Sequence, residues 1–151
     1  EMVGEDGDDF VQREAYETRW QGNLPGSQQY YIRVNASGVD TRYTLVITIP
    51  RVVEFPVGSF GKVETGRVDP GEAVAYRLWA AKGQTMSLSF NSAGAKPLIG
   101  VYVLEDGSPL VRPESGLSAW SGVLPEDGQY VVQVYGPAQE GVDYTLLFDI
   151  R

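Results

Sequence analysis

The chain has 151 residues, a formal net charge of −8 and neither cysteine nor histidine. These absences exclude a thiolate nucleophile, a Cys/His zinc site and a Ser-His-Asp triad. The negative charge argues against a nucleic-acid partner, because phosphate binding needs clustered Lys and Arg. We expect no membrane span, since no apolar run approaches the roughly 18 residues that one requires.

The first twenty residues are acidic, with seven acidic side chains against two basic ones. Within them, EDGDD (5–9) clusters the oxygen ligands that calcium prefers, and Asp6, Asp8 and Asp9 are the candidate ligands. The stretch lacks the D-x-[DN]-x-[DN]-G spacing of a calcium loop. A hairpin turn with solvated acids is the competing interpretation, because Asp-Gly tolerates the positive φ of a tight turn. Calcium is the only cofactor that the sequence suggests.

Two strands are expected in the remainder of the first fifty residues. YYIRV (30–34) would place its first, third and fifth residues inward and Tyr31 outward. YTLVITI (43–49) alternates in the same way, with Tyr43 the first of four residues on one face.

The rest of the chain shows the same two-residue period. TMSLSF (85–90) alternates apolar and hydroxyl residues, which is typical of a half-buried strand. Turn signals such as DPG (69–71), EDG (105–107) and EDG (126–128) separate the runs. Because no stretch has a convincing 3.6-residue stripe, we predict an all-β, antiparallel, jelly-roll-like β-sandwich. Further strands are expected near residues 52–55, 61–68, 74–80, 97–104 and 129–135.

The start of the chain is repeated near its end. Thirteen positions of residues 1–34 match residues 101–134, and one inserted residue then aligns 43–49 with YTLLFDI (144–150). The two segments are therefore copies of one structural unit. In each copy we expect the Trp ring to be buried at the sandwich edge, Gly to give it room and Leu-Pro to end the segment before a Tyr strand. These residues are Trp20, Gly22, Leu24, Pro25 and Tyr30, and Trp120, Gly122, Leu124, Pro125 and Tyr130.

The repeat predicts the domain organisation. Residues 1–50 are the trailing half of one repeat, and residues 51–151 are a complete unit. Half a sandwich leaves its apolar face in water, and each exposed Leu or Ile forgoes about 1.5–3 kcal/mol. The missing half in a longer protein, packing against the complete unit, or completion by another chain through strand exchange would cover that face. We therefore expect a protein partner or self-association through residues 1–50.

The order of motifs resembles the bacterial pre-peptidase C-terminal (PPC) domain. The resemblance lies in GRVDPGEAVAYRLWAAKGQTMSLSF (66–90), WSGVLPEDGQYVVQV (120–134) and YTLLFDI (144–150). It implies a small, non-catalytic jelly roll that occurs in tandem in exported bacterial proteins and serves adhesion, secretion or spacing. Some members of that family bind calcium. The implied location is extracellular, at the cell surface or in the periplasm.

The chain also resembles the periplasmic inhibitor of goose-type lysozyme, through VEFPVGSFGKVETGRV (53–68) and AAKGQTMSLSF (80–90). That family presents arginines to the lysozyme cleft from the loop before its last strand. The corresponding loop, YGPAQEGVD (135–143), has two acidic residues and neither Arg nor Lys. The resemblance therefore does not carry the inhibitor function to this chain.

Exposed aromatic residues are a further candidate site. Tyr31, Trp79 and Tyr135 fall on outward or loop-proximal positions by parity, as in a platform that binds a glycan or a protein. Aromatic residues also favour strands for their β propensity alone. Nothing in the sequence places two carboxylates across a cleft, so we expect no enzyme. The sequence favours a non-catalytic structural or adhesive module of an exported protein, with a glycan- or protein-binding module as the alternative.

Overall fold

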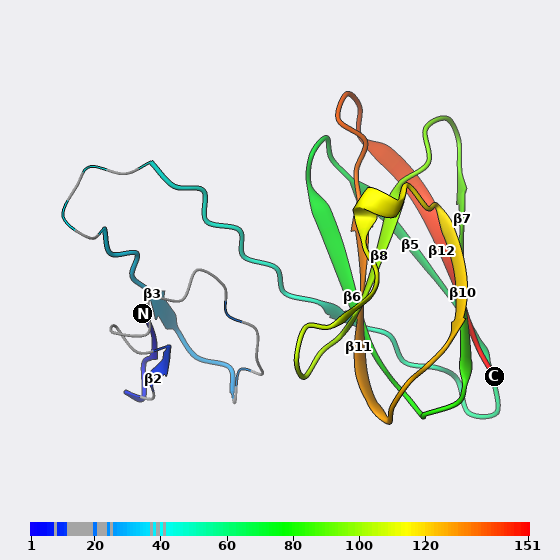
Figure 1. The fold of residues 1–151 in the computed structure, drawn as a ribbon, viewed down its shortest axis with the longest axis horizontal. Coiled ribbons are helices and arrows are strands. Elements are labelled where there is room, and N and C mark those ends of the chain that lie inside the picture. The colour runs from blue at the N-terminus through cyan, green and yellow to red at the C-terminus, as the bar shows by residue number, and fades with distance from the viewer. Residues whose placement is uncertain are drawn as a thin grey trace. The chain divides into compact units, whose positions relative to one another are not determined.

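The computed structural model describes residues 1–7, 9–11, 20, 24, 26–36, 38, 40 and 42–151, without the side chains of 9–11 (Figure 1). The chain divides into two compact units, Glu1–Val46 and Ile47–Arg151. Within the described ranges there is no helix that is both long and apolar enough to span a membrane.

The second unit is a β-sandwich of two sheets that lie face to face (Figure 1). One sheet has the order β10-β7-β12-β5 and the other β4-β6-β11-β8-β9. Neighbours pair antiparallel, except that β4 runs parallel to β6. The predicted all-β sandwich is confirmed. Its elements are β4 (Arg51–Val52), β5 (Gly61–Val68), β6 (Ala73–Ala80), β7 (Thr85–Ser92), β8 (Leu98–Val103), β9 (Pro109–Val111), the 3₁₀ turn η1 (Pro113–Ser115), β10 (Ala119–Val123), β11 (Gly128–Tyr135) and β12 (Val142–Ile150).

The core lies between the two sheets and follows the period of two. Alternate residues of β12, from Tyr144 to Ile150, are buried against alternate residues of β11 and β6. The Tyr76 and Phe148 rings meet edge to face, with centroids 5.8 Å apart. Every buried side chain of the described residues is apolar or a tyrosine. Within the described part of the chain, the interior therefore contributes apolar packing and holds no charged side chain.

The repeated Trp-Gly-Leu-Pro motif lies on β10 and just after it. The Trp120 ring packs against the core, and a Cβ atom at Gly122 would overlap that ring. Leu124 is fully buried. The Tyr130 hydroxyl donates to the carbonyl of Glu126 at 2.6 Å, which fixes the turn before β11.

The first unit contains a small antiparallel sheet of β1 (Met2–Gly4), β2 (Asp9–Val11) and β3 (Tyr30–Ile32), in the order β2-β1-β3. This order matches β9-β8-β11 of the second unit. The Tyr30 hydroxyl donates to the carbonyl of Gly26 at 2.7 Å, as Tyr130 does to Glu126. The pairing of β1 differs by one residue, because Val3 lies opposite Tyr31 whereas Val103 lies opposite Tyr130. The strand order and the tyrosine hydrogen bond are thus repeated, and the register of β1 is not.

The strand expected at residues 43–49 is wrong for this structure, in which the segment is extended coil (Figure 1). A strand needs a hydrogen-bonded neighbour, and none of the described residues pairs with this segment. The expected inward orientation of Ile32 and Val34 is also wrong, because both are exposed. The strand expected at 52–55 is reduced to β4, although Val53 is buried and its N–H donates to the Arg77 carbonyl at 2.8 Å.

Candidate interaction surfaces

The acidic turn proposed as a calcium site is described only in part. The Gln28 side chain donates from Nε2 to Oδ2 of Asp6 at 2.8 Å, and its Oε1 accepts from the Asp6 N–H at 3.1 Å. Asp8 lies outside the described residues, and of Asp9 only the backbone is described, in β2. Among the side chains that are described, no three acidic groups converge on one point. The calcium site stays a prediction.

Asp106 occupies the matching turn of the second unit. Its carboxylate accepts hydrogen bonds from the hydroxyl and the backbone N–H of Ser108. These bonds stabilise the charged form and hold the pKa of Asp106 below its ordinary value. Gly107 has a positive φ of 72°, as a tight turn after Asp requires. The acid therefore has a structural partner within its own turn.

Two of the three aromatic candidates share one sheet face. Trp79 on β6 lies opposite Gln129, and Tyr135 on β11 lies opposite Ala73, so both are on the outer face of the five-stranded sheet but six residues apart along β11. Trp79 is 62% exposed. Tyr31 lies on β3 in the first unit, where it is exposed and donates to Oε1 of Gln29 at 3.0 Å. The structure does not gather the three into one site.

Tyr102 belongs to the same outer face and was missed from the sequence. Its hydroxyl lies 3.3 Å from that of Tyr135, which also contacts Oε1 of Gln133. Both rings cover Gly100, where a Cβ atom would come within 2.8 Å of Tyr102 and 3.1 Å of Tyr135. Alternation within residues 97–104 could have placed Tyr102 on the outer face of the sheet. It could not have shown that the rings of Tyr102 and Tyr135 pack over Gly100. The hydroxyl groups of Tyr102 and Tyr135 thus have hydrogen-bond partners within the sheet. Of the aromatic residues discussed on this face, Trp79 is the one whose ring is exposed for a ligand.

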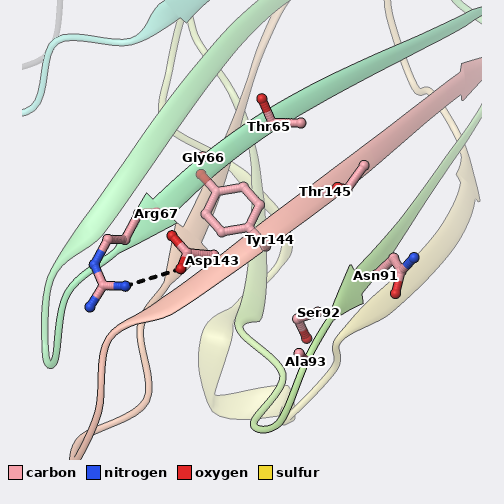
Figure 2. A pocket seen from close by; sticks show the side chains of 9 residues that line it. All are labelled: Thr65, Gly66, Arg67, Asn91, Ser92, Ala93, Asp143, Tyr144 and Thr145. Carbon is pink, nitrogen blue, oxygen red and sulfur yellow. Dashed lines mark hydrogen bonds and ion pairs between the residues drawn. The ribbon is translucent and has the colours of Figure 1, made fainter.

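A shallow polar hollow lies where β5, β7 and β12 meet (Figure 2). Arg67 donates to Asp69 and to Asp143, each at 3.2 Å, so its charge is already compensated. Tyr144 is the phenol of this hollow, and burial, together with a hydrogen bond to Tyr76, raises its pKa far above the ordinary value. It therefore stays protonated at neutral pH. Its lining residues are Thr65, Gly66, Arg67, Asn91, Ser92, Ala93, Asp143, Tyr144 and Thr145.

Arg67 also lies against the loop that precedes the last strand. A Cβ atom at Gly141 would come within 2.5 Å of its Nη2. No sequence pattern indicates this contact, because the two positions lie far apart in the chain. Its ion pairs with Asp69 and Asp143 join β5 to the start of β12.

Among the described residues of the first unit, one edge of the small sheet has no paired strand. In the second unit β11 pairs with β8 on one side and β6 on the other, whereas the described residues pair β3 with β1 alone. Residues 43–49 are likewise open, with Leu45 49%, Ile47 62% and Ile49 78% exposed. Their counterparts in β12 are at most 6% exposed. One repeated pattern is thus buried at residues 144–150 and exposed at residues 43–49.

No family model matches the chain, and no curated protein matches it. Solved structures do. The fold is similar to that of PliG from Aeromonas hydrophila, a periplasmic inhibitor of g-type lysozyme, at 24% identity and a TM-score of 0.59, over 68% of this chain and 96% of that one. The Salmonella Typhimurium PliG is similar at 21% identity and a TM-score of 0.51, over 66% and 96% of the two chains.

The pre-peptidase C-terminal domain of a Bacillus anthracis collagenase is also found, at 12% identity and a TM-score of 0.49, over 72% of this chain and all of that domain. Both families named from the sequence are therefore among the similar structures. The similarity to the inhibitors shows the sandwich fold alone.

Proposed function

We propose that this chain is a non-catalytic accessory module of an exported bacterial protein, and that it acts by contact with another polypeptide through residues 1–50. One observation carries the proposal. The strand-forming sequence 43–49 is exposed, whereas its repeat, 144–150, is the buried centre of a sheet. Exposed contiguous apolar residues of this kind are typical of interaction sites.

The interior and the hollow support a role without catalysis. The described core is apolar apart from tyrosines, and the ionisable groups of the hollow are paired or kept protonated. The similar PliG proteins are periplasmic and act on another protein, a lysozyme. From them we carry over a location outside the cytoplasm and a protein partner, but not the lysozyme itself.

Site-specific photo-crosslinking tests the proposal. A photoreactive amino acid replaces Ile47 in the full chain, which is exported by the bacterium that encodes it. We expect a discrete adduct with a polypeptide. The matched control carries the same group at Glu114, an exposed position of η1, and should give no such band. Absence of an adduct at position 47, or equal adducts at both positions, would contradict a polypeptide contact.

A glycan is the second candidate ligand, and one observation favours it. Trp79 on the outer face of the five-stranded sheet is 62% exposed. An exposed aromatic ring suits a sugar, which offers an apolar face. Retention on insoluble polysaccharides that is lost in Trp79→Ala would support this ligand, and equal retention of both proteins would exclude this face.

A further inference from the structure

We infer that the partner of residues 1–50 is the front half of a repeat of the same kind, a polypeptide with the strand pattern of residues 51–97. The inference rests on the proposed function and deepens it, because it names the partner. The second unit provides the template, since it contains the same back-half sequence with its front half in place. The two features that the described part of residues 1–50 leaves open, one edge of β3 and both sides of 43–49, have occupants there.

The open edge of β3 corresponds to the edge of β11 that pairs with β6. In that pair, Tyr130 lies opposite Leu78 and Val132 lies opposite Tyr76. The match between β3 and β11 therefore predicts a β6-like strand beside β3. A leucine-like residue of that strand would lie opposite Tyr30, and a tyrosine-like residue opposite Ile32.

Residues 43–49 correspond to β12, which lies between β5 and β7. There Leu146 is opposite Glu64 on one side and Phe90 on the other, and its side chain is fully buried. Leu45 is the matching residue and is exposed. A central strand needs a neighbour on each side, so the partner must supply two strands here. One additional strand at an edge would not suffice.

Tyr43 restricts which residues the partner strands can carry beside it. Its counterpart Tyr144 places its hydroxyl 2.9 Å from that of Tyr76. The same hydroxyl would lie only 2.7 Å from a Cβ atom at Gly66, which lies opposite Tyr144 on β5. The partner should therefore have glycine opposite Tyr43 and a hydroxyl on its β6-like strand. A front half carries both on one segment, in Gly66 and Tyr76.

Charge supports the same partner. Residues 51–97 contain six basic and four acidic residues, whereas residues 98–151 contain two basic and eight acidic ones. An acidic back half is thus paired with a basic front half in the second unit. Residues 1–50 contain four basic and eight acidic residues. Their net charge is therefore negative, like that of the back half in the second unit. In a second copy of this chain the front half is already paired with its own back half, which makes that copy the weaker candidate.

The test extends the full chain. A duplicate of residues 51–100 is fused directly ahead of Glu1, as residues 51–100 precede Val101. Amide hydrogen exchange of residues 43–49 is compared with and without the extension, and the second unit serves as an internal standard. We expect exchange at 43–49 to slow by at least about 100-fold, because these amides would enter a sheet. The matched control carries Tyr76→Ser, Leu78→Ser and Leu88→Ser in the duplicate only and should give no protection.

Three results would overturn the inference. Residues 43–49 could exchange equally fast with and without the duplicate while the second unit stays protected. The triple-serine control could protect them as well as the intact duplicate does. Protection could also appear without the duplicate and rise with protein concentration, which would make a second copy the occupant. A polypeptide adduct at position 47 together with any of these results would retain the proposed function and reject this partner.

Discussion

Gly66→Ala should destabilise the second unit through the tyrosine pair. The new Cβ atom would lie 2.7 Å from the hydroxyl of Tyr144 and 2.9 Å from its Cζ. Crowding of a packed core costs about 1–3 kcal/mol, and loss of the Tyr76–Tyr144 hydrogen bond adds roughly 1 kcal/mol. Removing a strand glycine returns about 0.5–1 kcal/mol. The net loss is about 1–3.5 kcal/mol, or a fall in Tm of about 4–15 °C for a unit of this size.

Urea unfolding followed by tryptophan fluorescence measures the loss. Gly61→Ala is the matched control, because it lies on the same strand and its Cβ atom would meet nothing closer than a carbonyl at 3.7 Å. It should change stability by less than about 0.5 kcal/mol or increase it slightly. Tyr144→Phe removes the crowded hydroxyl, so the double variant should be more stable than the sum of the two losses predicts. A Gly66→Ala loss below about 0.5 kcal/mol, or strict additivity, would refute the reasoning.

Three further predictions concern other parts of the chain. Gly122→Ala should cost about 1–3 kcal/mol by urea unfolding, because its Cβ atom would overlap the Trp120 ring; an unchanged midpoint would contradict this packing. The carboxyl of Asp106 should titrate below its ordinary pKa by NMR, and Ser108→Ala should raise that pKa. The stabilisation from these bonds is complete above the ordinary pKa of Asp and is lost as the pH falls through the lowered value, so an unshifted titration would argue against the turn. The chain should not inhibit goose-type lysozyme in a cell-wall lysis assay, because Arg67 beside the last loop is paired with two aspartates; inhibition at micromolar concentration would contradict this expectation.

Alternation predicted the strands that are buried on one face. β5, β6, β7, β8, β11 and β12 lie within two residues of their expected ranges, because each has an inward row of apolar side chains. Short strands gave weaker signals. β9 begins with Pro109, and β10 is interrupted by Gly122, so neither has a readable alternation.

The failure at residues 43–49 has a different cause. Their sequence is as strand-like as that of β12, but a strand is a property of two segments, and pairing depends on the neighbour that is present. The candidate surfaces show the same limit. Parity placed Trp79 on an outer face, whereas the contacts of Tyr102 with Tyr135 and of Arg67 with the last loop join residues far apart in the chain.

The hydrogen bond of the Tyr30 hydroxyl bears on the entropy cost of binding a partner strand at β3. It joins residues only four apart, so it forms without help from any second layer. The turn that leads into β3 is thus fixed locally, by residues of the first unit alone. Part of the conformational entropy of this turn is therefore lost before a partner strand binds. A strand that pairs with β3 would bind more tightly to that extent.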